Sequence, residues 1–198
     1  MYKIFINNKR EPISSLLKWN ENNVFFDEAD WNKIFELPFK ITQESKFHWL
    51  QFQILHRIIP TNYYLFKLKL IDSPACTFCL TDLETIDHLF VECFKVKDLW
   101  CRIEEWVLDK FEMHCSFDKM SILFGKYENR NICKVQNLFI LTVKQFIFAS
   151  KYKSIPKLNI DILIKRIIER IFIEKVLLLQ SCKYMEYERH WQKICDVL

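Results

Sequence analysis

The sequence predicts a mainly α-helical fold with one small knuckle of cysteine and histidine side chains. Glycine occurs once in 198 residues, at Gly125. Tight hairpins and glycine-rich loops, which depend on glycine, are therefore not expected to be common. Apolar residues recur at intervals of three and four through much of the chain after residue 42, which is the helical period. The segment CTFCLTDLETIDHLFVEC, residues 76–93, holds three cysteines and one histidine.

Composition narrows the class of protein. Hydrophobic residues make up 51% of the chain and charged residues 27%, a balance typical of folded globular proteins. No run of eighteen apolar residues and no signal peptide is seen, so we expect an intracellular protein, cytoplasmic or nuclear, with no membrane partner. In such a reducing compartment eight cysteines do not indicate a disulfide framework.

The N-terminal part is expected to begin irregularly. Residues 1–25 lack a clear period and include NENN, so we interpret them as an irregular lead-in. Asp27 is a good N-cap for a short helix through Phe35, which should end before Pro38.

The next two helices lead to the knuckle. Thr42 is predicted to cap a helix whose apolar residues continue until Pro60. Thr61 restarts a helix in TNYYLFKLKL, and the turn residues 72–74 end it beside the first cysteine.

Four helices are predicted after the knuckle, over residues 94–111, 117–124, 131–152 and 160–190. Gly125 suits a helix C-terminus and Asn159 an N-cap. The segment 144–193 carries eleven Lys/Arg and five Asp/Glu, which fits either a polyanionic partner or a solvated helix face. The second alternative gains support from three possible i,i+4 ion pairs, Asp161–Lys165, Lys165–Glu169 and Arg170–Glu174.

The knuckle has the spacing of a metal site, Cys76-x2-Cys79-x8-His88-x4-Cys93. Three thiolates and an imidazole complete a closed, tetrahedral Cys₃His set, which is typical of structural zinc. No coordination position remains for a water, so hydrolysis is not expected there. A redox Cys-x2-Cys pair would need a βαβ context that the sequence lacks, and the second pair of ligands makes a chance cluster a poor explanation.

The spacing between His88 and Cys93 also constrains the local fold. Residues five apart on a regular helix point about 140° apart, so both cannot face one ion from such a helix. We expect Thr85 to cap a short helix carrying His88 and the chain to tighten or break near Glu92. Without zinc, residues 74–95 should lose their structure because their own core is thin.

An ordered pattern of residues surrounds the four ligands over roughly residues 31–106: Trp49, His56, Arg57, Ile59, Pro60, Thr61, Ser73, Pro74, Cys76, Cys79, Glu84, Thr85, His88, Leu89, Cys93 and Trp100. This pattern resembles the zinc-binding domain at the C-terminal side of reverse transcriptases of LINE-type, non-LTR retrotransposons. The resemblance implies a zinc-binding domain over 26–106, with its knuckle at 74–95, and a C-terminal helical region over 107–198. It also implies a polymerase core upstream in a longer polyprotein.

Catalytic motifs are not seen in the sequence. It has neither a (Tyr/Phe)-x-Asp-Asp polymerase signature nor an acidic–histidine nuclease set, so we expect no enzyme activity from the chain on its own. The string VFFDEAD at 24–30 resembles a helicase box, but an ATPase also needs a glycine-rich phosphate loop that one glycine cannot supply.

Two classes of function remain open. In the first, the zinc knuckle belongs to a module that binds RNA or DNA, the element's own RNA or its target DNA. The candidate contacts are the basic and aromatic residues near the metal: His56, Arg57, Lys67, Lys69, Phe78, Lys95, Lys97 and Arg102. Basic groups would neutralise phosphates, and an exposed Phe78 at the knuckle tip would stack on a base, although it also suits a core.

In the second class, the chain is a structural or protein-interaction piece. An apolar stripe on the last long helix would suit a partner surface or a core: Ile160, Leu163, Ile164, Ile167, Ile168 and Ile171. A decayed but folded retrotransposon fragment is a further alternative. Salt-dependent binding to single-stranded nucleic acid separates the first class from the others.

Overall fold

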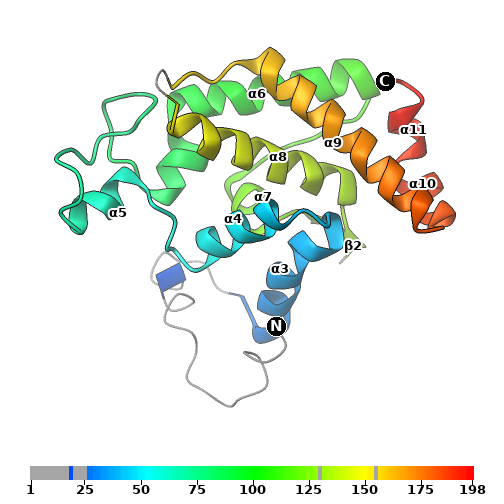
Figure 1. The fold of residues 1–198 in the computed structure, drawn as a ribbon, viewed down its shortest axis with the longest axis horizontal. Helices are drawn as coiled ribbons and strands as arrows, with labels where there is room; N and C mark the ends of the chain where they lie inside the picture. The colour runs from blue at the N-terminus through cyan, green and yellow to red at the C-terminus, as the bar shows by residue number, and fades with distance from the viewer. Residues whose placement is uncertain (1–17, 20–25, 129–130, 154–155) are drawn as a thin grey trace.

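The computed structural model describes residues 18–19, 26–128, 131–153 and 156–198, and it confirms a mainly helical fold (Figure 1). From residue 26 onward, the described residues begin with α3 (Glu28–Ile41), α4 (Ser45–Leu55), α5 (Asn62–Lys67), the π-helix η1 (His88–Glu92) and α6 (Phe94–Phe111). They are followed by α7 (Lys119–Phe124), α8 (Lys134–Lys151), α9 (Ile160–Gln180), α10 (Tyr184–His190) and α11 (Gln192–Cys195). Two-residue strands, β1 (Tyr127–Glu128) and β2 (Asn131–Ile132), pair antiparallel between α7 and α8.

The first predicted helix begins where expected but runs further. Asp27 accepts a hydrogen bond from the Asp30 amide at 2.7 Å, as an N-cap does. The predicted end before Pro38 is wrong, because α3 continues through this residue to Ile41. The Thr42 amide donates to the Pro38 carbonyl at 3.1 Å and closes the last turn. Burial of Leu37 and Ile41 offsets the backbone bond that proline removes.

The predicted course of the second helix is wrong at both ends. Thr42 ends α3 instead of capping α4, whose N-cap position is Glu44 and has no side-chain cap. At the other end α4 stops at Leu55, five residues before Pro60. Arg57 takes a left-handed conformation with φ of 54°, and its amide closes the turn on a carbonyl of the helix end.

This helix end recurs twice, each time without glycine. Arg57, Lys69 and Cys182 have φ between 54° and 57° after α4, α5 and α9. In each case the amide of the left-handed residue and the amide of the residue after it donate to carbonyls of the last helical turn. This pair of hydrogen bonds is the Schellman motif. The third of these ends α9 near residue 181, so the single helix predicted over 160–190 is wrong and α10 starts afresh at Tyr184. Local spacing could not reveal it, because apolar residues continue past the break.

Several local signals are confirmed. The hydroxyl of Thr61 accepts from the Tyr64 amide, and the side chain of Asn159 accepts from the Ile162 amide. Gly125 follows α7 with φ of 96°, and a Cβ there would lie 1.9 Å from Cδ2 of Leu37. The one glycine therefore serves both a left-handed turn and a close approach of α7 to α3.

The core is one continuous cluster of buried apolar side chains. It includes Trp19 at one end of the chain and Trp191 at the other, and it takes in residues of the helices between them. Trp19 is 1% exposed and donates from Nε1 to the Leu55 carbonyl at 2.8 Å. The predicted irregular lead-in otherwise lies outside the described residues. The domain boundary at residue 106 stays a prediction, and it falls inside α6.

The apolar stripe of the last long helix is mainly core. Ile160, Leu163, Ile167 and Ile171 are buried, as α9 packs against α8 and α6. Figure 1 shows α9 lying across α8. No helix within the described ranges is long and apolar enough to cross a membrane.

The charges of α9 do not pair as the sequence suggested. None of the three i,i+4 combinations forms an ion pair among the described residues. Arg170 contacts Glu44 at the start of α4 instead, and Glu174 accepts a 2.6 Å hydrogen bond from the Thr42 hydroxyl. Arg170 is thus directed across to α4 and does not pair within α9.

Lys144 is a lysine buried in this core at 1% exposure. Its Nζ donates to Oε1 of Gln51 at 2.5 Å, and Gln51 in turn donates to the Leu123 carbonyl at 2.8 Å. No ion pair to Lys144 exists within the described part of the chain. Burial lowers the pKa of Lys144 to about 7, because the charged form is poorly solvated there.

We expect this lysine to make stability depend on pH. The folded chain releases the Lys144 proton near pH 7 and the unfolded chain near pH 10.5, so the unfolded state binds more protons in between. The free energy of unfolding should therefore rise from pH 7 toward pH 10, by a few kcal/mol in order of magnitude. Denaturant titrations of wild type and Lys144→Met test this. Equal pH slopes for the two proteins would contradict it.

Candidate metal centre

The four predicted ligands converge. The sulfurs of Cys76, Cys79 and Cys93 and a ring nitrogen of His88 all lie within 4.8 Å of one another. The Cys76 and Cys93 sulfurs are 3.8 Å apart, and Cys79 Sγ lies 3.3 Å from His88 Nε2. A tetrahedral zinc with ordinary bond lengths separates two sulfurs by about 3.8 Å and a sulfur from a nitrogen by about 3.6 Å. The arrangement therefore fits a Cys₃His zinc site.

A short turn closed by backbone hydrogen bonds presents the first two cysteines. The Cys76 amide donates to the Asp82 carbonyl at 2.8 Å, and the Leu80 amide donates to the Cys76 carbonyl at 2.9 Å. Ala75 and Leu83 form an isolated antiparallel bridge across the base of this turn. The Phe78 amide points at the Cys76 sulfur at 3.4 Å. These contacts turn both sulfurs toward one point.

The other two ligands are the first residue of η1 and the residue that follows it. The predicted break near Glu92 is confirmed, because η1 ends at Glu92 and Cys93 leaves the helical conformation before α6 begins. The predicted tightening is wrong, because the turn before the break is widened. The Cys93 amide donates to the His88 carbonyl at 2.9 Å, so the bond spans five residues. This π-helical turn is wider than an α-turn and brings residues five apart back to one side. Thr85 caps it as predicted, with its hydroxyl accepting from the His88 amide at 3.1 Å.

Two of the three thiols, Cys79 and Cys93, have a pKa below the ordinary value for cysteine. A hydrogen bond from the Cys76 thiol lowers the pKa of Cys93 to about 5, and the same bond, with burial, raises the pKa of Cys76. Burial raises the pKa of Cys79, but the Asp82 amide and the Thr81 hydroxyl outweigh it and hold this pKa below its ordinary value. Thiolates are the form that binds metal. With four protein donors such a zinc would be structural, because no position remains for a reacting water.

Glu84 ties the knuckle to the rest of the molecule, and sequence reasoning gave it no role. Its carboxylate is fully buried and accepts from the amides of Asn62 at 2.9 Å and Thr77 at 2.7 Å. It also forms a buried ion pair with Lys151 at the end of α8, and Lys151 donates to Oδ1 of Asn62 at 2.6 Å. Thr77 lies between the first two ligands, so this ion pair joins the metal turn directly to α8.

The ligand-bearing turn η1 is also held by contacts with the core and by ion pairs on the surface. Leu89 and Phe90 of η1 are completely buried, and Trp100 of α6 donates from Nε1 to the Phe90 carbonyl at 2.8 Å. On the surface, Lys119 bridges Asp87 and Glu92 at 2.9 Å each. The knuckle is therefore held by η1, α6 and α8, with the metal ligands at its centre.

Comparison with known proteins agrees with this geometry. Residues 13–100 match the family described as zinc-binding in reverse transcriptase. This segment belongs to that family. The reverse transcriptase zinc-binding domain is an accessory domain and not a catalytic one. Its matched range begins ahead of Trp19 and ends at Trp100, so it includes the buried tryptophan that the sequence pattern left out. No curated protein matches the chain.

The candidate nucleic-acid contacts of the zinc-binding domain fall into different environments. His56 packs on the rings of Phe35 and Phe52, and burial lowers its pKa. Phe78 is half-buried and packs against the core, which agrees with the second of the two environments considered for it, the core, and not with an exposed knuckle tip. The tip position is taken by Leu80, which is 75% exposed.

The basic candidates lie on two surfaces. Arg57 and Lys67 line one cavity beside the knuckle. Lys69 is exposed at the end of α5. The other three, Lys95, Lys97 and Arg102, lie exposed on α6. Lys95 and Arg102 are seven residues apart and therefore share a helix face. The structure thus brings only Arg57 and Lys67 together.

Proposed function

We propose that the chain is a non-catalytic accessory module of a LINE-type, non-LTR retrotransposon reverse transcriptase. In this proposal it forms the C-terminal side of a longer polyprotein and binds RNA or DNA, the element's own RNA or its target DNA. Structural zinc keeps the knuckle folded, and basic and aromatic side chains beside it contact the nucleic acid. The family match and the Cys₃His cluster support the zinc-binding part.

A cavity beside the knuckle is the single observation that carries the nucleic-acid part. It has a volume of about 410 Å³. Its basic and aromatic lining residues are Lys18, Arg57, Tyr63, Tyr64 and Lys67, and Ile59, Thr61, Thr85 and Ile86 complete the wall. Three cations around two tyrosines suit a phosphate and a stacked base.

The cations of this cavity are held in place by the aromatic rings. Lys67 Nζ lies 4.4 Å from the centre of the Tyr63 ring, and the Arg57 guanidinium lies 4.4 Å from that of Trp19. Arg57 Nη1 is buried and has no hydrogen-bond acceptor within the described residues. A buried donor without an acceptor is costly.

Binding of single-stranded RNA and DNA over a range of salt tests the proposal. Wild type should bind with an affinity that falls steeply as salt rises. Lys67→Gln with Lys69→Gln should weaken binding and reduce the slope of log K against log[salt] by about 1.4, since each lost phosphate contact on a single strand contributes about 0.7. Lys33→Gln with Lys110→Gln removes two exposed charges elsewhere and should leave binding nearly unchanged. Absence of any salt-dependent binding by wild type would refute the proposal.

A protein-docking function is the second candidate, and a different observation favours it. Apolar side chains are exposed on α5 and on the knuckle: Phe66, Leu68, Leu70, Leu80 and Leu83. Figure 1 shows α5 and the knuckle loops projecting from the helical body. Apolar exposure of this kind marks interaction surfaces. If it docks on a polymerase core, Leu70→Ser with Leu80→Ser should abolish association with that core and leave nucleic-acid affinity unchanged.

A further inference from the structure

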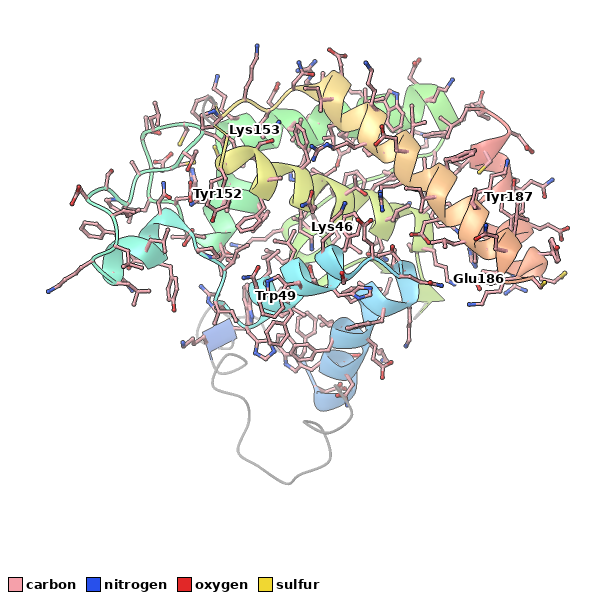
Figure 2. The ribbon with its side chains drawn as sticks, viewed as in Figure 1. Lys46, Trp49, Tyr152, Lys153, Glu186 and Tyr187 are labelled. Atoms are coloured by element: carbon pink, nitrogen blue, oxygen red, sulfur yellow. The ribbon has the colours of Figure 1, made fainter. Side chains whose placement is uncertain are left out.

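A second cavity lies between α4, α8 and α9, away from the knuckle. Its volume is about 280 Å³, and Lys46 of α4, Gln145 and Ala149 of α8, and Arg166, Glu169 and Arg170 of α9 line it. In Figure 2 Lys46 lies on the near face, beside α8. We call this cavity and its exposed edges the α4–α9 groove.

Cations outnumber carboxylates in the α4–α9 groove. Glu44 contacts Lys46 at 2.5 Å and also pairs with Arg170. Arg166 makes no ion pair within the part of the chain that the structure describes, although Glu169 lines the same cavity. Burial and then the charge of Arg166 lower the pKa of Lys46. The two cations therefore repel each other across the groove, and an anion between them would relieve this repulsion.

A fourth cation, Lys153, lies near the same aromatic ring as Arg166 but does not line the cavity. Arg166 lies 5.4 Å and Lys153 Nζ 5.9 Å from the centre of the Phe146 ring. Glu174 sits deeper, where burial raises the pKa of its carboxyl and the Thr42 hydroxyl donates to it. Its carboxylate interacts with Arg170.

Two exposed aromatic side chains lie on the elements that form the groove, although they do not line the cavity. Trp49 is 59% exposed and stands one helical turn after Lys46, with its ring stacked on Phe52 at 5.4 Å between centres. Tyr152 is 56% exposed and continues the lining row of α8, three residues after Ala149. Figure 2 shows Trp49, Lys46, Tyr152 and Lys153 on the same side of the molecule. Exposed rings beside cations suit unpaired bases, which stack on aromatic faces regardless of sequence.

We propose that the α4–α9 groove binds single-stranded nucleic acid, with one phosphate between Lys46 and Arg166 and a base stacked on Trp49. This inference rests on the proposed function and deepens it, because it adds a second contact surface that α4 shares with α8 and α9, and these last two helices lie outside the matched family segment. A strand that occupies both surfaces would pass the end of α8, where Tyr152 donates to the Pro60 carbonyl at 3.4 Å.

Variants on the groove surface test this inference with the zinc-loaded full chain. The probes are a fluorescent oligouridylate, an oligothymidylate of equal length, and the corresponding duplex. Lys46→Gln with Arg166→Gln removes the contact to one phosphate and should reduce the salt slope by about 0.7. Trp49→Ala should weaken single-strand binding by roughly fivefold to a hundredfold and leave the salt slope unchanged, since stacking carries no charge. Lys33→Gln with Lys110→Gln is again the matched charge control.

The outcomes distinguish failure of the groove proposal from failure of the proposed function. Wild-type binding that Lys67→Gln with Lys69→Gln weakens, but that the groove variants leave intact, would overturn the groove and keep the proposed function. Competition by polyglutamate as strong as by oligouridylate, with no effect of Trp49→Ala, would assign the groove to an acidic protein segment instead. No binding by wild type would overturn both. Preference for oligouridylate or oligothymidylate identifies RNA or DNA as the strand.

Discussion

Cys79→Ser is expected to abolish zinc binding and to unfold the knuckle while the helical body stays folded. Cys79 is half-buried, so serine leaves little cavity and the effect reports loss of a ligand. Structural zinc contributes on the order of 10 kcal/mol to the segment that it organises. The amides of residues 74–93 should then exchange with solvent far faster, whereas those of α8 and α9 keep their protection. Metal analysis and hydrogen exchange on the same samples measure both effects.

Cys101→Ser is the matched control for this experiment. Cys101 is exposed on α6 and lies outside the four-ligand cluster. It should keep one zinc per chain and wild-type exchange rates. A folded wild type without zinc, or full zinc content in Cys79→Ser, would contradict the assignment of the site.

Lys151→Met is expected to lower the free energy of unfolding by about 3 to 5 kcal/mol. It leaves the buried carboxylate of Glu84 without its counter-charge, and a lone buried charge is strongly destabilising. Glu84→Gln should cost a comparable amount, because an amide nitrogen cannot accept the hydrogen bond that one carboxylate oxygen accepts from Asn62 or Thr77. The double variant should be less unstable than the sum of the two. Denaturant unfolding of the four proteins gives the coupling energy.

Lys119→Met serves as the comparison for a lysine on the surface of the same knuckle. Lys119 bridges two carboxylates but is 43% exposed, and exposed ion pairs are worth about 1 kcal/mol or less. If Lys151→Met costs no more than Lys119→Met, the buried pair does not anchor the knuckle. Strict additivity of Glu84→Gln and Lys151→Met would lead to the same conclusion.

The features that the sequence predicted well are those that depend on nearby residues. The zinc ligands fall within one short segment, and the caps at Asp27, Thr61 and Asn159 each bind an amide three residues away. Helix periods could likewise be recognised because each apolar face repeats every few residues. Gly125 was predictable as a helix end, although its close approach to Leu37 was not.

The features that were missed depend on residues far apart in the chain. Pro38 remains inside α3 because burial on both sides of it outweighs a lost hydrogen bond, which no local signal reports. Glu84 and Lys151 are 67 residues apart, and nothing in either neighbourhood predicts their pairing. Trp19 offered one signal, a large aromatic residue in a polar stretch. The π-turn could have been inferred, because the x4 spacing of His88 and Cys93 requires two residues five apart to face one ion.

The ion pair between Glu84 and Lys151 bears on how this protein can be shortened. The matched family segment ends at Trp100, yet the lysine that neutralises its buried carboxylate and the helices that cover its apolar faces come later in the chain. A polypeptide trimmed to the family boundaries would retain all four cysteine and histidine donors. It would, however, expose apolar core side chains to solvent and leave the Glu84 carboxylate without its counter-charge. Expression limits for the zinc-binding domain should therefore be set by the last residue of α9 or beyond, and not by the extent of family similarity.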